Sequence, residues 1–154
     1  MLDKIQVLHD EAEEYAKAKS SDLETQVGAI AVYKSYFNPD RIGSYFAVKE
    51  TNRFVDGAKG LPNTRPNKYE FMQHAEANLV FAAANRGLAL KYAVVVCTLS
   101  PCQNCIRTMF QAGIREVYFK NKYHSYDPVM LDILVTESQE GDFTKLTLTN
   151  HPES

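Results

Sequence analysis

Apolar residues recur along this chain at two kinds of spacing, which predict helices and strands. Within residues 1–19, apolar positions lie three or four apart, as on one face of an amphipathic helix; they are Leu2, Ile5, Leu8, Ala12 and Tyr15. Short apolar runs elsewhere are typical of strands. They predict strands over residues 27–33, 45–52, 92–98, 116–119 and 143–148, the first two antiparallel and the last alternating as an edge strand does.

Two further helices carry start and stop signals. Residues 74–86 are rich in Ala, and Gly87 is well placed to end that helix. In the next helix, Ser100 fits the N-cap, Pro101 the first position, and Gln103 completes a capping box. The sequence therefore predicts that one helix begins at His74 and the next at Ser100-Pro101.

A last helix is predicted from Asp127-Pro128 through about residue 138, while residues 56–69 lack periodicity and read as a long loop. Helices and strands thus alternate along most of the chain. Alternation of this kind predicts an α/β fold with three layers, α/β/α, around a five-stranded mixed sheet. We expect residues 1–154 to form a single domain.

Composition narrows the classes of function. The formal net charge of −2 gives no basic excess, which argues against a long nucleic acid as ligand and for a small nucleotide. No apolar run approaches the roughly 20 residues that span a bilayer, and residues 1–19 lack a signal-peptide core. We therefore expect a cytoplasmic protein without a membrane partner, in which a Cys-x-x-Cys pair serves metal or redox chemistry.

The chemistry of the chain concentrates in two short motifs, His74-Ala75-Glu76 and Pro101-Cys102-Gln103-Asn104-Cys105. Cysteines three apart on a helix point the same way and can hold one ion. A His and a Glu two apart can serve one site only if they begin a helix, as the pattern predicts here. One His and two Cys make three ligands for Zn²⁺, which leaves the fourth position for water, as in catalytic zinc sites.

Glu76 is the candidate proton carrier. Zinc lowers the pKa of bound water to about 7, so a zinc-bound hydroxide can act as nucleophile. A carboxylate beside the metal can take the proton from the water and pass it to the substrate. His-x-Glu followed by Pro-Cys-x-x-Cys is the signature of the zinc deaminases of nucleobases.

Other interpretations of the separate motifs stay open. A Cys-x-x-Cys alone also occurs in redox-active dithiols, and His-x-Glu alone is common. The combination, with each half opening a helix, favours the zinc site. Cys97 lies in a predicted buried strand, where it is either a small core residue or a fourth ligand; the core role is favoured.

The chain resembles the cytidine deaminase superfamily and, within it, the deoxycytidylate deaminases. The resemblance extends over most of the chain, on the motifs Gln26-Val27-Gly28-Ala29, Asn52-Arg53, Gly60-Leu61-Pro62, His74-Ala75-Glu76, Thr98-Leu99-Ser100-Pro101-Cys102, Gln111-Ala112-Gly113-Ile114 and Lys122-Tyr123-His124. It implies a cytidine deaminase-like fold and the zinc-dependent conversion of dCMP to dUMP and ammonia.

The resemblance also implies roles for residues that the motifs alone do not assign. Asn52 would hydrogen-bond the deoxyribose. The backbone N–H of Ala75 and the carbonyl of Ser100 would contact the cytosine edge, and Tyr123 would lie beside the base or phosphate.

Members of this family are commonly hexamers that dCTP activates and dTTP inhibits, so the resemblance implies a homo-oligomer and an effector site, with Mg²⁺ as a companion of a bound triphosphate. The effector loop of the family usually reads Gly-Tyr-Asn-Gly-x-Pro. Here Ala58 and Lys59 replace the Tyr and Asn, between Gly57 and Gly60. Effector selectivity is therefore in question, and Lys59 could add a charge contact to a triphosphate.

Alternative functions remain at this point. A related deaminase could act on dCTP, a free cytosine nucleoside or tRNA adenosine. A protein of a different class, a catalytically silent zinc-containing module that senses nucleotides, would share the metal ligands and lack turnover.

Overall fold

A computed structural model describes residues 1–22, 24–38, 46–55, 72–121 and 134–149. These residues form three α-helices, a short 3-10 helix and eight strands. The elements are α1 (Leu2–Lys19), β1 (Gly28–Val32), η1 (Lys34–Phe37), β2 (Phe46–Thr51), β3 (Arg53–Phe54), β4 (Met72–Gln73), α2 (Ala75–Arg86), β5 (Val94–Cys97), α3 (Gln103–Gln111), β6 (Glu116–Phe119), β7 (Val135–Glu140) and β8 (Phe143–Leu148).

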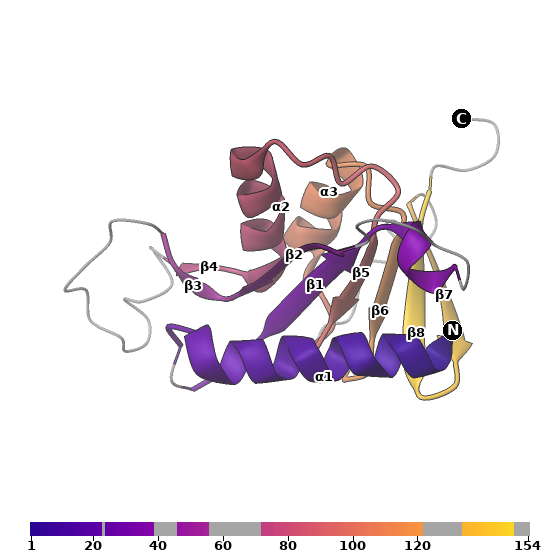
Figure 1. The fold of residues 1–154 in the computed structure, drawn as a ribbon, viewed down its shortest axis with the longest axis horizontal. Coiled ribbons are helices and arrows are strands. Elements are labelled where there is room, and N and C mark those ends of the chain that lie inside the picture. The colour runs from indigo at the N-terminus through magenta and orange to yellow at the C-terminus, as the bar shows by residue number, and fades with distance from the viewer. Residues whose placement is uncertain (23, 39–45, 56–71, 122–133, 150–154) are drawn as a thin grey trace.

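Six of the strands form one mixed sheet in the order β2-β1-β5-β6-β8-β7 (Figure 1). β5 and β6 are parallel and are joined through α3, whereas the other neighbouring pairs are antiparallel. β3 and β4 pair separately as a small two-stranded arm. The five predicted strands are all present, and the predicted antiparallel pairing of the first two is confirmed.

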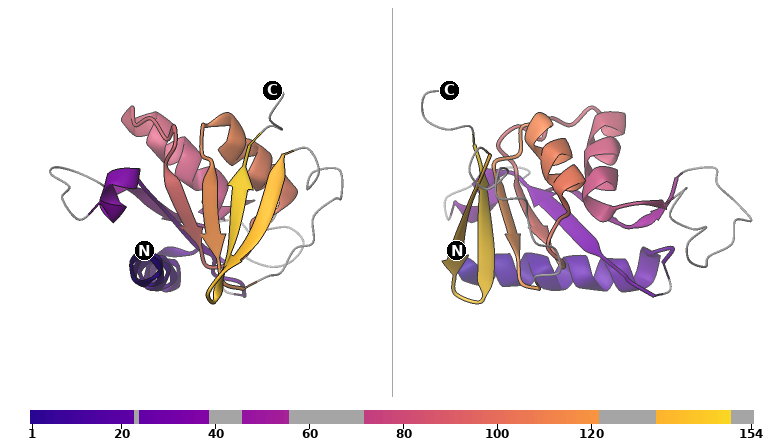
Figure 2. Two further views of the ribbon diagram at one scale, coloured as in Figure 1. Left: turned by 90° about the vertical axis from the view of Figure 1, so that its right-hand side faces the viewer. Right: turned by 180° about the vertical axis from the view of Figure 1, so that it is seen from behind.

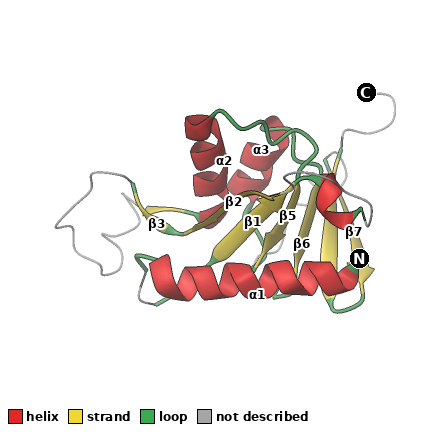
Figure 3. Cartoon of the chain, viewed as in Figure 1, coloured by secondary structure: helices red, strands yellow, loops and turns green. Residues whose placement is uncertain are grey.

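Helices cover both faces of the large sheet, which gives the predicted three layers. α1 lies across one face, and α2 and α3 lie side by side on the other (Figures 1, 2 and 3). Because successive strand residues point to opposite faces, Ile30 packs toward α1 while Ala29 and Ala31 pack toward α2 and α3. A sheet buried on both faces explains why its central strands read as continuous apolar runs.

The start of β1 and helix α1 lie in direct backbone contact. A Cβ atom added to Gly28 would lie 2.1 Å from the carbonyl oxygen of Ala12, far inside van der Waals contact. Only glycine therefore allows α1 to pack this closely against the sheet. The N–H of Gly28 also donates a hydrogen bond to Oγ1 of Thr98, directly after β5 (2.9 Å). Gly28 thereby contacts the segment that leads to the site described below.

The predicted helix over 127–138 is wrong for its last part, because Val135–Glu140 is strand β7. Residues 127–133 lie outside the described residues. β7 pairs with β8 through a hairpin whose turn contains Gly141, with a φ of 62°. The large sheet consequently has six strands where five were predicted, and β8 is an internal strand with β7 as the edge.

The predicted start of α3 is also wrong. The helix begins at Gln103 with Cys102 as its N-cap, so Ser100 and Pro101 precede it and form no capping box. The backbone N–H of Ser100 instead donates to the carbonyl of Asn121, at the end of β6 (2.9 Å). This tertiary contact holds the chain extended for two more residues before the helix begins.

Membrane-spanning helices are absent from the described residues: none of these helices has an apolar stretch long enough to cross a bilayer.

Candidate metal centre

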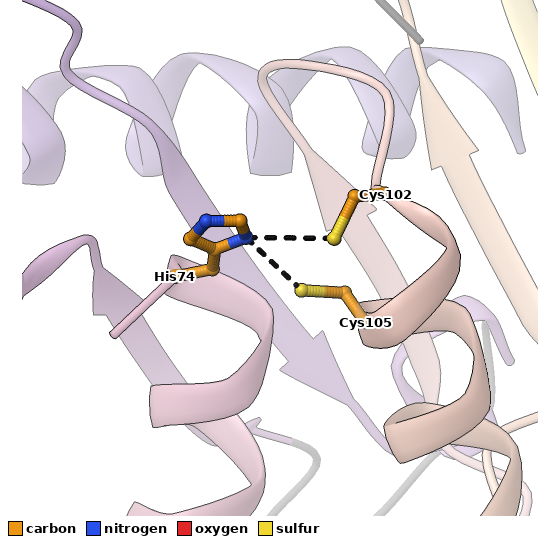
Figure 4. Close-up of side chains that lie close together, drawn as sticks. All are labelled: His74, Cys102 and Cys105. Carbon is orange, nitrogen blue, oxygen red and sulfur yellow. Dashed lines mark hydrogen bonds between the residues drawn. The ribbon is translucent and has the colours of Figure 1, made fainter. Parts of the chain in front are cut away.

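The two sequence motifs converge at the starts of two neighbouring helices. His74 is the N-cap of α2, Cys102 is the N-cap of α3, and Cys105 lies in the first turn of α3. Their side chains point toward one another across the gap between the helices (Figure 4). One ligand atom from each residue lies within 4.8 Å of the other two, and this is the only such cluster of at least three ligand groups among the described residues.

The distances within the cluster fit a tetrahedral zinc ion. Nδ1 of His74 lies 3.5 Å from Sγ of Cys102 and 3.4 Å from Sγ of Cys105. Zn–N and Zn–S bonds of about 2.0 and 2.3 Å at a tetrahedral angle separate the two ligand atoms by roughly 3.5 Å. The donor set of one imidazole and two thiols is also one that zinc prefers over magnesium or calcium.

The three ligand groups of the cluster influence one another's protonation. The pKa of Cys102 is lowered to about 3, because the thiol of Cys105 donates a hydrogen bond to it and His74 adds a second contact, while burial opposes the change. The same shared proton, together with burial, raises the pKa of Cys105. Contact with Cys102 likewise raises the pKa of His74. A bound ion would therefore have to displace the proton shared by the two thiols and any proton on the imidazole.

Glu76 lies in the first turn of α2, two residues after His74, and only 3% of its surface is exposed. Burial raises the pKa of its carboxyl group to about 7; its own backbone N–H and His74 partly offset this rise. A carboxyl group that titrates near neutral pH can both accept and release a proton. The Glu76 carboxyl group interacts electrostatically with His74 and Cys102, so it lies close to the cluster.

The residues predicted to contact the substrate are Ala75, Ser100, Tyr123 and Asn52. Ala75 and Ser100 are buried and lie within two positions of His74 and Cys102, so the structure brings both to the metal cluster. Tyr123 lies outside the described residues. So do the predicted effector residues Gly57, Lys59 and Gly60.

Asn52 has an extensive structural role. Its Oδ1 accepts hydrogen bonds from the hydroxyl of Ser20 (2.7 Å) and the N–H of Val27 (3.0 Å). Its Nδ2 donates to the carbonyl of Thr25 (2.8 Å). Asn52 therefore holds the connection between α1 and β1 against the end of β2.

We expect Asn52→Ala to lower the free energy of unfolding of the metal-free protein by about 2–3 kcal/mol, because buried partners lose their hydrogen bonds. Urea unfolding of the variant measures this change. Asn85→Ala, on the exposed surface of α2, is the matched control and should change stability by less than about 0.5 kcal/mol. If Asn52→Ala lowered the free energy of unfolding by no more than Asn85→Ala does, the hydrogen bonds of Asn52 would not hold this connection.

Two further asparagines near the site were not predicted from the sequence. Asn78 is a buried polar residue of the Ala-rich helix α2, and Asn121 lies two residues after the end of strand β6. A buried amide in an apolar helix needs hydrogen-bond partners, so its position was a usable signal. The contacts of Asn121 depend on tertiary structure and had no local signal.

Cys97 lies at the end of β5 and is fully buried in the core that faces α2 and α3. Its sulfur is not part of the three-residue cluster. Burial, followed by the charge of Glu76, raises its pKa well above the ordinary value, so its thiol stays protonated. The preference for a core role over a fourth ligand agrees with this position.

Comparison with protein families gives a match over most of the chain. The family described as "Cytidine and deoxycytidylate deaminase zinc-binding region" matches residues 2–121. The deoxycytidylate deaminase of Enterobacteria phage T2 is 36% identical over 61 residues, which cover 40% of this chain and 32% of that protein. The Mus musculus deoxycytidylate deaminase is 32% identical over 87 residues, 55% of this chain and 47% of the other. The chain thus spans about a third to a half of these relatives' lengths.

A similar solved structure extends the match to the fold. The dCMP deaminase from the cyanophage S-TIM5, in complex with dCMP and dUMP, superposes with a TM-score of 0.63 at 26% sequence identity. The superposition covers 77% of this chain and 81% of that protein.

Proposed function

The chain belongs to the cytidine and deoxycytidylate deaminase zinc-binding family, and from this premise we propose that it hydrolyses dCMP to dUMP and ammonia. The proposal takes residues 1–154 as one deaminase domain. The observation that carries it is the cluster of His74, Cys102 and Cys105 at two facing helix starts, with the buried carboxyl group of Glu76 beside it.

The reaction needs an ion, a water molecule and a proton carrier at one place. When bound, zinc would supply a Lewis acid that lowers the pKa of a coordinated water to about 7. Glu76 accepts a proton from the water, whose oxygen bonds to C4 of the cytosine ring, and delivers that proton to ring N3. Glu76 then takes the proton of the new C4 hydroxyl group and delivers it to the exocyclic amine. The C4–N bond breaks, ammonia leaves, and the base remains as uracil with a carbonyl at C4.

The substrate contacts are part of the proposal. The Ala75 N–H and the Ser100 carbonyl would hold the cytosine edge next to Glu76, and Asn52 and Tyr123 would contact the sugar and the base or phosphate. The solved relative that binds dCMP and dUMP supports a nucleotide substrate.

A panel of substrates tests this proposal. The zinc-loaded protein should release ammonia from dCMP at a kcat/KM at least about tenfold above those for deoxycytidine, dCTP and a tRNA anticodon stem-loop, because phosphate contacts in a built site discriminate by a kcal/mol or more. The same assay on protein without zinc is the control. Turnover of the tRNA stem-loop or the free nucleoside, with none of dCMP, would assign the site to another substrate of the family.

Regulation and assembly extend the proposal. The loop with Gly57, Lys59 and Gly60 would bind dCTP as activator or dTTP as inhibitor, with Mg²⁺ on the triphosphate, in a homo-oligomer such as a hexamer. Saturation curves for dCMP, recorded with and without each triphosphate, test it, together with the mass of the protein in solution. Identical curves across a broad range of triphosphate concentrations would exclude this regulation.

A further inference from the structure

The metal ligands come from two separate helices, so their spacing depends on how each helix start is held. His74 begins α2 after the two-residue strand β4, and Cys102 begins α3 after an irregular segment. Helix propensity fixes neither start relative to the other. A zinc site nevertheless tolerates deviations of only about 0.2 Å in its bond lengths.

Asn78 holds the start of α2. Its Nδ2 donates to the carbonyl of Thr51, the last residue of β2 (2.8 Å), and to the carbonyl of Gln73, which directly precedes His74 (3.3 Å). Asn78 is 5% exposed, so these bonds are shielded from water. One amide thereby ties the residue before His74 to the end of the sheet.

Asn121 holds the start of α3. Its Nδ2 donates to the carbonyl of Thr98 (3.1 Å), and its own carbonyl accepts the N–H of Ser100 (2.9 Å). On its other side, Thr98 exchanges two hydrogen bonds of 2.9 Å with Gly28 of β1. The segment that leads to Cys102 is therefore held between β1 and the end of β6.

We propose that Asn78 and Asn121 are positioning residues that set the distance between His74 and the two cysteines. The side-chain amide of Asn78 holds the carbonyl one position before His74, and that of Asn121 holds the carbonyl of Thr98, in the segment that leads to Cys102. Without them the helix starts would stay helical but would sample a wider range of separations. Zinc binding would then have to restrict the two helix starts to one separation, and this loss of entropy would weaken the affinity for zinc. The inference rests on the zinc site proposed above.

Zinc affinity is the direct test. Asn78→Ala and Asn121→Ala should each raise the zinc dissociation constant about three- to tenfold, the range expected for one or two lost hydrogen bonds. Competition with a chromophoric chelator measures the constant at a temperature where circular dichroism shows each metal-free variant folded. Asn85→Ala, an exposed asparagine two turns further along α2, should leave the constant within twofold of the parent value.

The choice of alanine separates positioning from stability. Alanine has the higher helix propensity, so Asn78→Ala regains part of the stability that its lost bonds remove. If Asn78→Ala does not fold, Asn78→Ser takes its place. Asn121 is exposed, so we expect Asn121→Ala to fold. An unchanged zinc constant with a lowered melting temperature would overturn the inference. A parent protein that binds no zinc would overturn the proposed function instead.

Discussion

Glu76→Gln is expected to abolish turnover of dCMP while the protein keeps its zinc. The amide has the size and shape of the carboxyl group, so the helix start and the metal ligands stay in place. It cannot accept a proton from water, so the loss should reach at least about 1000-fold in kcat. Ammonia release and zinc content, measured on the same preparation, give both parts of the result. Glu14→Gln, on the exposed surface of α1, is the control and should keep full activity.

The same substitution should stabilise the metal-free protein at alkaline pH. The folded protein keeps a proton on Glu76 up to about pH 7, whereas the unfolded chain releases it near pH 4.5. The unfolding free energy therefore falls as pH rises through this window, because burial opposes the charged form. Glu76→Gln removes that cost and should gain up to about 3 kcal/mol at pH 8 and almost nothing at pH 4. Equal stability of variant and parent at pH 8 would contradict the assigned burial.

Cys105→Ser is expected to remove the metal and with it all activity. A serine hydroxyl is a poor ligand for zinc at neutral pH, and two remaining ligands hold the ion weakly. Elemental analysis after dialysis should find close to one zinc per chain in the parent and almost none in the variant. The melting temperature of the parent should rise when zinc is added, and that of the variant should not.

Cys97→Ala is the matched control, because Cys97 is buried close to the site but outside the cluster. It leaves a small cavity and should cost about 1–2 kcal/mol of stability while the zinc content stays near one per chain. Zinc retained by Cys105→Ser, or lost by Cys97→Ala, would show that the ligands are assigned wrongly.

The convergence of His74, Cys102 and Cys105 could be predicted because most of its geometry is local. Two cysteines three apart share a helix face wherever the helix lies, and His-x-Glu can serve one site only at a helix start. Both conditions hold in the structure, with His74 and Cys102 as N-caps. The five predicted strands could be recognised for a similar reason, since their apolar runs are long enough to distinguish a strand from a loop.

The errors lie where tertiary contacts decide the local structure. Val135–Glu140 forms a strand because it pairs with β8, although a single residue of it is buried. The Gly141-Asp142 pair between two strand-length runs was the available signal for a hairpin. At α3 the capping pattern was chemically reasonable, but Ser100 contacts Asn121 instead and the helix begins two residues later than predicted.

Asn52 shows a second kind of limit. Its residue type and its place after a strand are visible in the sequence, whereas its partners Ser20, Thr25 and Val27 come from a connection that folds back only in three dimensions. Side chains that position a site through backbone contacts, such as Asn78 and Asn121, share this property. Their roles emerge from the hydrogen bonds and not from a spacing rule.

The central claim is that the cluster of His74, Cys102 and Cys105 holds one zinc ion on which hydrolysis of dCMP depends. The most direct measurement is the rate of dUMP formation while zinc is titrated into metal-free protein. The account predicts that the rate rises from almost zero in proportion to added zinc and becomes constant at one ion per chain. Full activity without zinc, or one tightly bound zinc per chain without dUMP, would contradict it.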